Sequence, residues 1–314
     1  MGPRLGETPG TVAVEVFFVI SGFLVTRSLL ARRSAIDFVT ARLFRIFPGL
    51  VFQAIFAALV LGALLSAVPA SKYYSSQQPL DYVLKTIALQ VPIDALPGVN
   101  LGNASLWSLP LEVALYGMLL FAWLARNAIL DEAGGKLAAW AKGAAYAALF
   151  ALATCWFTRR GGFKLAMMFG SGVAFYLLRD KIRLSPRLAV FGLAALATAA
   201  MNALAFRLAL VCVLPYVVLC AAYLPRGRIL NFNLLGDYSY GLYIYAFPIQ
   251  LATLHYLPHA GVWTVVTISA LAAAAMAVLS WHLVEKRALK AVPPVIRALH
   301  KLKSAPVAQP SQPL

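Results

Sequence analysis

Apolar segments long enough to cross a lipid bilayer recur along the whole chain, and they constrain its fold more than any other feature. A transmembrane helix needs about 20 predominantly apolar residues. Such segments lie at about 11–31, 46–69, 106–126, 139–158, 163–179, 187–205, 207–224, 237–257 and 260–284. Apolar residues make up 61% of the sequence, against roughly 45–50% in soluble domains. The sequence therefore predicts an all-α, polytopic transmembrane helix bundle of about nine spans.

Basic residues divide unequally between the two sides of this predicted bundle. Of the 27 Lys and Arg residues, 20 fall in one set of alternate loops and 7 in the other. Cytoplasmic loops carry an excess of Lys and Arg, so the division predicts a cytoplasmic C-terminus. The same rule accounts for the net charge of +16. No soluble basic domain is visible, so we do not expect nucleic-acid binding.

The end of the chain differs in composition from the rest. Prolines are frequent after residue 290, at 293, 294, 306, 310 and 313, and the apolar runs have ended there. We expect residues 1–290 to form one integral-membrane domain. Residues 291–314 are expected to form a disordered cytoplasmic tail.

Three glutamates lie within or at the end of predicted spans. A charged group near the bilayer centre costs about 2.5–3.5 kcal/mol on insertion scales, so Glu15, Glu112 and Glu285 need a reason to be there. Each either serves chemistry or pairs with an arginine and fixes packing, and the sequence leaves both open. Ser108, Glu112 and Tyr116 share one helix face. The carboxylate on that face needs a partner or a water-filled cavity.

Arg42 and Arg45 stand about one helical turn apart, just before Pro48. Two guanidinium groups on one face suit the geometry of phosphate. Arginines that snorkel to the membrane surface produce the same pattern. The pair therefore predicts either a phosphate site or a topology signal.

Aromatic residues and histidines supply the remaining candidates. Trp107 has the position of an interfacial aromatic. Tyr245 is one of four tyrosines in "GDYSYGLYIYAFPIQ", which either eases packing or lines a groove for a sugar or an acyl chain. His282 and Glu285 are three residues apart and could act as a pair. The sequence contains no HExxH, GxSxG, P-loop or CxxC motif, and we expect no metal site.

Five stretches occur in a fixed order over essentially the whole chain. They are "VEVFFVISGFLV" with Glu15, "ARLFRIFP" with Arg42 and Arg45, "SLWSLPLEVALYG" with Trp107, Glu112 and Tyr116, "SYGLYIYAFPI" with Tyr245, and "HLVEKRAL" with Glu285. Together they resemble the membrane-bound acyltransferase 3 family. That family comprises bacterial O-acyltransferases that modify surface and exported polysaccharides.

The resemblance implies a function and a location. The expected reaction transfers an acyl group, often acetyl, from acyl-CoA to a hydroxyl of a polysaccharide or its lipid-linked precursor, at the bacterial inner membrane. Acetyl-CoA is then a substrate, with no bound cofactor, and membrane lipid is a further partner. The resemblance assigns catalysis to Glu112 and Glu15, coenzyme A binding to Arg42 and Arg45, and substrate binding to Trp107, Tyr116, Tyr245 and Glu285.

One departure from the family concerns its first helix. Family members have about ten spans, and the first carries an Arg and, about ten residues later, a His thought to act as general base. This sequence starts at the family's second helix, and we expect the first to be missing. Two alternatives to an active acyltransferase therefore stay open: a transporter that uses Glu15 and Glu112 as ion sites, and a non-catalytic remnant of the family.

Overall fold

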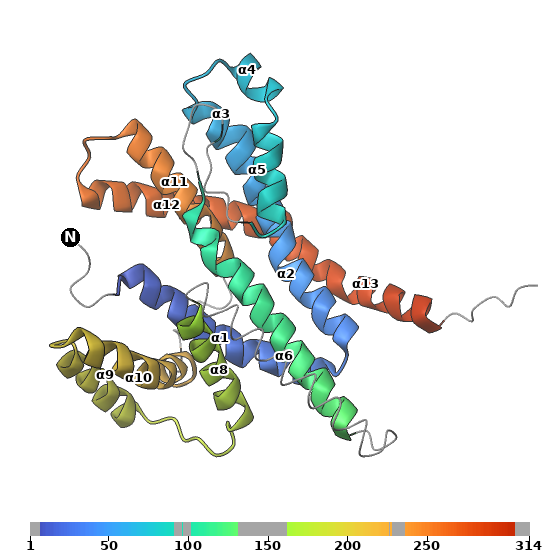
Figure 1. Cartoon of the computed structure of the whole chain (residues 1–314), viewed down its shortest axis with the longest axis vertical. Helices are drawn as coiled ribbons and strands as arrows, with labels where there is room; N and C mark the ends of the chain where they lie inside the picture. The colour runs from blue at the N-terminus through green and yellow to red at the C-terminus, as the bar shows by residue number, and fades with distance from the viewer. Residues whose placement is uncertain are drawn as a thin grey trace, which may run out of the picture. The chain divides into compact units, whose positions relative to one another are not determined.

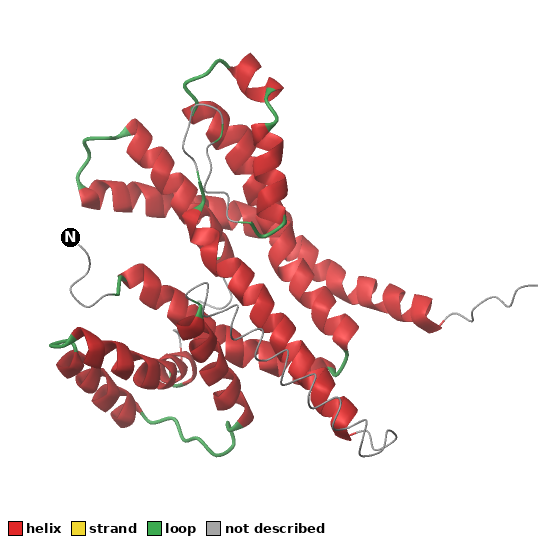
Figure 2. Cartoon of the chain, viewed as in Figure 1, coloured by secondary structure: helices red, strands yellow, loops and turns green. Residues whose placement is uncertain are grey.

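The part of the chain that the structure describes is mainly helical. The structure is a computed structural model that describes residues 7–90, 96, 102–130, 162–225, 227 and 236–304. These residues form helices joined by loops, with no β-strand among them (Figures 1 and 2). Eight of the nine predicted apolar segments are helices, and the ninth, 139–158, lies outside the described residues. The predicted all-α membrane bundle is confirmed.

Five of the described helices are long and apolar enough to cross a membrane. They are Pro9–Arg32, Ala35–Leu65, Ala104–Asn127, Ala203–Tyr223 and Val262–Leu302. Phe163–Leu177 and Pro186–Ala199 are apolar but shorter. The chain divides into two compact units, here called unit 1 (residues 1–33 and 108–235) and unit 2 (residues 34–107 and 236–314). Each unit is described by itself.

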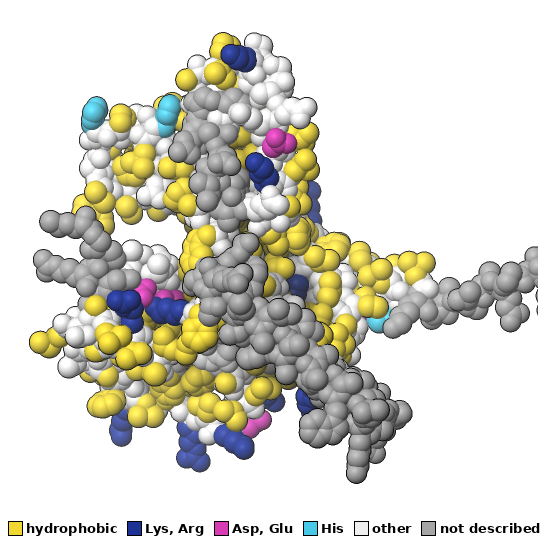
Figure 3. All heavy atoms as spheres, in the orientation of Figure 1, with side chains coloured by type: hydrophobic (Ala, Val, Ile, Leu, Met, Phe, Trp, Pro, Cys, Tyr) yellow, Lys and Arg dark blue, Asp and Glu magenta, His cyan; other side chains and the backbone are white. Residues whose placement is uncertain are grey.

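Unit 1 is built on the first helix. Its helices are α1 (Pro9–Arg32), α6 (Leu109–Leu130), α8 (Phe163–Leu177), α9 (Pro186–Ala199) and α10 (Ala203–Tyr223). α1 begins at a capping box in which Thr8 and Thr11 each accept from the other's backbone N–H. α1 packs against α8, and α9 packs against α10 (Figure 1). Basic side chains gather where α8 connects to α9, a segment that contains Arg179, Lys181 and Arg183 (Figure 3).

Two glycines bring α1 and α8 into backbone contact. A Cβ added at Gly22 of α1 would overlap the Phe169 carbonyl of α8, and one added at Gly172 would overlap the Val19 carbonyl of α1. Small residues allow such close approach between membrane helices, where van der Waals packing drives association. This contact explains why α1 contains a glycine, Gly22, in its middle.

Unit 2 contains two long helical rods. One is α2 (Ala35–Phe56), a π-helical turn η1 (Ala57–Leu61) and α3 (Gly62–Leu65); the other is α12 (Val262–Ser280), a π-helical turn η5 (Trp281–Glu285) and α13 (Lys286–Ser304). The remaining elements are α4 (Ala70–Ser75), α5 (Gln78–Ile87), α11 (Ser239–Tyr256) and η2 (Ala104–Ser108), whose last residue belongs to unit 1. α5 and α11 both pack against α2, and α11 also packs against α12.

An apolar core surrounds η1 in unit 2. It comprises Ala57, Ala58, Leu65, Tyr73, Tyr82 and Leu96. The Tyr73 hydroxyl donates a hydrogen bond of 2.5 Å to the Ala58 carbonyl. Burial raises the pKa of Tyr73 to about 12, so the phenol stays a neutral donor. This bond satisfies a carbonyl in the π-helical turn.

The second predicted span begins earlier than the apolar run indicated. The sequence predicted it from residue 46, whereas α2 starts at Ala35. Ser34 caps the helix by accepting from the Asp37 N–H, and this local signal extends the helix ahead of the apolar run. Arg42 and Arg45 consequently lie inside the helix rather than in the loop before it.

The predicted C-terminal tail is helical in its first part. α13 continues to Ser304, through Pro293 and Pro294, while residues 305–314 lie outside the described residues. Apolar and basic residues alternate at helical spacing in this segment, and α13 packs against α2. Val292 is buried, and the His300 Nε2 lies 2.7 Å from Asp37 Oδ1. This packing accounts for helix where composition predicted a disordered tail.

Candidate functional site

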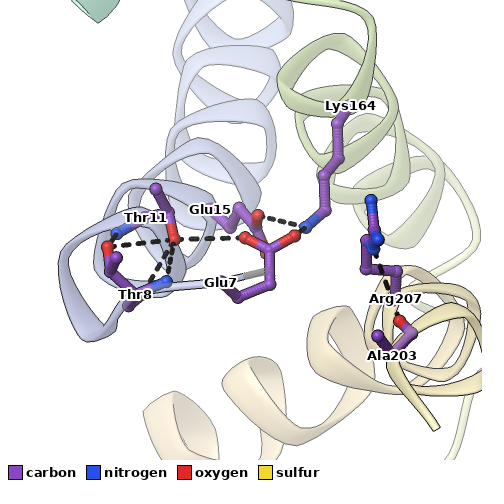
Figure 4. Close-up of polar contacts among 7 residues, drawn as sticks. All are labelled: Glu7, Thr8, Thr11, Glu15, Lys164, Ala203 and Arg207. Carbon is purple, nitrogen blue, oxygen red and sulfur yellow. Dashed lines mark hydrogen bonds and ion pairs between the residues drawn. The ribbon is translucent and has the colours of Figure 1, made fainter. Parts of the chain in front are cut away.

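Glu15 is a buried carboxylate with one oxygen bound to a lysine and the other bound by no described residue. It lies on α1 with 2% of its surface exposed. Its Oε1 is 2.5 Å from the Lys164 Nζ of α8, and the same ammonium is 2.6 Å from Glu7 Oε1 (Figure 4). Glu15 Oε2 is buried and has no hydrogen-bond partner among the described residues. The group is therefore held in place and still has an acceptor oxygen to offer.

Glu112 ends a chain of buried hydroxyls that joins α6 to α1. The Tyr116 hydroxyl donates to Glu112 Oε1, one turn earlier on α6. The same hydroxyl lies 2.9 Å from the Ser21 Oγ of α1. Ser21, Glu112 and Tyr116 are all buried, as is Ser108. The predicted polar face of this helix is present, and its partner is a serine of α1.

Arg45 occupies a second charged cluster, in unit 2. Its Nη2 is 2.5 Å from Asp237 Oδ2, and its Nη1 is 3.9 Å from Glu285 Oε2. The guanidinium also lies 5.8 Å from the centre of the Tyr240 ring, within cation–π range. The Arg45 side chain is 22% exposed and that of Asp237 is 51% exposed. This arginine is therefore reachable from solvent and is held by an acid that solvent also reaches.

Glu285 is held by its own π-helical turn. It is 2% exposed, and its Oε1 accepts a 2.8 Å hydrogen bond from Ser280 Oγ, five residues earlier. A π-helix closes i to i+5, and such turns recur at functional sites. Gly49 of α2 makes room for this carboxyl, because a Cβ there would lie 3.3 Å from Glu285 Cγ.

Tyr245 and His282 differ in burial and in their neighbours. Tyr245 is fully buried, packs on Phe56 at a ring distance of 6.0 Å, and lies close to Ser280 and Glu285. His282 is exposed, and its Nε2 is 3.4 Å from the Tyr238 hydroxyl. Glu285 instead bonds Ser280, so the structure gives the His282–Glu285 pair no support.

Each unit gathers a subset of the residues that the sequence singled out. Glu15, Glu112 and Tyr116 belong to unit 1. Unit 2 contains Arg42, Arg45, Trp107, Tyr245 and Glu285. Arg42 is half-buried on α2, and Trp107 is 41% exposed. The assignment of these residues to catalysis or binding stays a prediction.

Several members of these clusters were not predicted from the sequence. Lys164 counted only as a loop charge, although a cation at the start of an apolar helix is a natural partner for a membrane acid. Ser21, Asp237 and Ser280 gave no signal, because their partners come from distant parts of the chain. Only a structure brings residues 21 and 116, or 45 and 237, within bonding distance.

Comparison with known proteins identifies the family. The profile of the acyltransferase-3 family, described as an acyltransferase domain, matches residues 3–284. The chain belongs to this family. It is therefore an acyltransferase of the membrane-bound type, as the sequence motifs indicated.

Two curated relatives cover most of the chain. An O-acetyl transferase of Shigella phage Sf6 is 29% identical over 90% of this chain and 86% of its own length. Nodulation protein 10 of Rhizobium leguminosarum bv. viciae is 29% identical over 91% of this chain and 83% of its own length. No solved structure matches the chain.

Proposed function

We propose that this acyltransferase moves an acetyl group from acetyl-CoA to a hydroxyl of a cell-surface or exported polysaccharide, or of its lipid-linked precursor. The protein acts in the bacterial inner membrane with its C-terminus in the cytoplasm. The name of the phage relative supports O-acetyl transfer. The observation that carries the proposal is Glu15, whose buried Oε2 has no hydrogen-bond partner among the described residues while Lys164 holds Oε1.

In the proposed reaction, unit 1 serves the acceptor hydroxyl. The hydroxyl oxygen attacks the thioester carbonyl carbon, the carbon–sulfur bond breaks, and coenzyme A leaves as the thiol. The hydroxyl proton passes to a base and then to the departing sulfur. Glu15 and Glu112 both serve the acceptor hydroxyl, by accepting its hydrogen bond and orienting it. A positioned base contributes about 10²- to 10⁴-fold in rate.

Unit 2 serves the donor in this proposal. Arg42 and Arg45 stand on one side of α2 and bind the phosphates of coenzyme A, because guanidinium forks match phosphate oxygens. In the structure the Asp237 carboxylate holds Arg45. A phosphate carries more negative charge than a carboxylate, so it displaces Asp237 from the guanidinium.

The test is acceptor-dependent release of the coenzyme A thiol. The full chain in nanodiscs is supplied with acetyl-CoA and with polysaccharide or lipid-linked sugar, and the ester product is identified by NMR. Glu15→Gln and Glu112→Gln should lower kcat at least 100-fold, whereas Arg42→Gln and Arg45→Gln should raise the KM for acetyl-CoA. Asp180→Asn, whose side chain is 83% exposed, is the matched control and should change neither constant.

Several outcomes would contradict the proposal. Unchanged kcat in both glutamate variants would remove them from the reaction, and unchanged KM in both arginine variants would remove the phosphate site. Uptake of a solute into proteoliposomes without ester formation would favour a transporter. Acetyl-CoA binding without transfer to any acceptor would identify a non-catalytic remnant.

A further inference from the structure

Unit 2 contains buried polar atoms that form no hydrogen bond with any described residue. Gln53 of α2 is 0% exposed, and neither its Nε2 nor its Oε1 has a hydrogen-bond partner among the residues that the structure describes. The buried hydroxyl of Tyr82 on α5 lies close enough to Gln53 to interact with it, and no described residue completes a hydrogen bond to this hydroxyl. Buried polar groups in native proteins are nearly always bonded, and exceptions call for an explanation. A leucine at position 53 would fill the same space without unsatisfied atoms.

The position of Gln53 relates it to Arg45. Arg45, Gly49 and Gln53 recur every four residues and so share one face of α2. A Cβ at Gly49 would lie 2.9 Å from the Tyr240 ring and 3.3 Å from Glu285 Cγ, so a phenol ring and a carboxyl-bearing side chain pack beside this face between the two. At 1.5 Å per residue, Gln53 stands roughly 12 Å along the helix from Arg45. The face thus offers a cation at one end and a neutral donor and acceptor further along.

This spacing and chemistry fit an extended ligand with phosphates at one end and amides behind them. A side-chain amide pairs with another amide through one N–H donor and one carbonyl acceptor. The arm of coenzyme A is such a chain, since amide groups separate its phosphates from the sulfur. The Tyr82 hydroxyl adds a donor for a carbonyl of the same arm.

We propose that Gln53 and Tyr82 bind the amide-bearing arm of the acyl-CoA donor whose phosphates Arg45 holds. This inference rests on the proposed donor. It gives unit 2 a binding site that reaches from Arg45, midway along α2, toward the core around η1. It also explains why a glutamine and a tyrosine are buried among apolar side chains.

The test distinguishes binding of the amide-bearing arm of coenzyme A from binding of its nucleotide. Binding of acetyl-CoA and of adenosine 3′,5′-bisphosphate, which lacks the arm, is measured by calorimetry on the full chain in detergent. Gln53→Leu should weaken acetyl-CoA binding about tenfold, as expected for two lost hydrogen bonds, and leave the bisphosphate affinity unchanged. Tyr82→Phe preserves shape and should weaken acetyl-CoA binding about threefold, so it serves if Gln53→Leu does not fold.

The matched control is a buried hydroxyl away from the proposed site. Thr253→Val removes a buried hydroxyl elsewhere in unit 2 and should change neither affinity. If the unaltered chain binds acetyl-CoA but both site variants bind it equally well, Gln53 and Tyr82 hold only water and the inference is overturned. If the unaltered chain binds no acetyl-CoA, the proposed donor itself is wrong.

Discussion

The contact between α1 and α8 leads to a prediction in which two neighbouring glycines respond in opposite ways. Gly170 and Gly172 lie two residues apart on α8. A Cβ at Gly170 would meet nothing within 4 Å, whereas one at Gly172 would lie 2.8 Å from the Phe23 N and still closer to the Val19 carbonyl. These neighbours are backbone atoms, which cannot rotate away as a side chain would. The two helices must therefore separate to accommodate Gly172→Ala.

The expected magnitudes follow from that geometry. Ordinary contacts begin at 3.4 Å, so the Phe23 N must move away by about 0.6 Å. The Val19 carbonyl is closer and must move further. Overpacking of this kind costs about 1–3 kcal/mol. Both substitutions gain up to about 1 kcal/mol of helix propensity, and this gain cancels in the comparison. We expect Gly170→Ala to be stabilising by about 0.5–1 kcal/mol and Gly172→Ala to be less stable than Gly170→Ala by about 1–3 kcal/mol.

Thermal unfolding of the purified variants in one detergent measures the difference. Gly22→Ala meets the Phe169 backbone from the opposite helix and should behave like Gly172→Ala. The crossing also brings Lys164 to Glu15, so both destabilised variants should lose transferase activity. If Gly172→Ala were as stable as Gly170→Ala, the close approach of α1 and α8 would be refuted.

The remaining predictions concern the two charged clusters. Lys164→Met should lower the free energy of unfolding by about 2 kcal/mol, because two carboxylates lose their cation at a site where the lysine side chain is 27% exposed. Lys164→Arg keeps the charge and should be near neutral. Equal thermal midpoints for the two variants would contradict the ion pair. Tyr116→Phe breaks the link between Ser21 and Glu112 and should lower kcat about tenfold with little change in the acetyl-CoA KM; an unchanged kcat in steady-state kinetics would make the link structural only. Asp237→Asn should lower the acetyl-CoA KM two- to fivefold, as expected for a partly exposed ion pair that competes with phosphate, whereas a higher KM would mean that Asp237 orients Arg45.

The sequence predicted the helices well because apolar length is a local property. A run of about 20 apolar residues predicts a membrane span whatever the rest of the chain contains. The start of α2 was misplaced by eleven residues because its signal is a single capping serine, Ser34, ahead of the apolar run. The helical start of the predicted tail was missed because its stability comes from packing on α2, which composition does not record.

The candidate site was only partly predictable, for a related reason. Glu15, Glu112 and Glu285 were visible because a charge within an apolar run is costly wherever it occurs. Their partners were not visible, because Lys164, Ser21 and Ser280 are ordinary residues in their own segments. The Gln53 amide, which no described residue bonds, was likewise not visible, because the sequence shows only a glutamine in a helix and not its burial.

The π-helical turn between α12 and α13 sets the rotational phase of everything that follows it. An α-helix advances about 100° per residue, and the turn at Trp281–Glu285 contains one more residue than an α-turn would. Removing a single residue there would restore a regular helix and rotate α13 by that angle about its axis. His300 would then leave Asp37 of α2, Val292 would lose its buried position, and Glu285 would leave Ser280. One residue of chain length thus determines which side of a 19-residue helix faces the rest of unit 2.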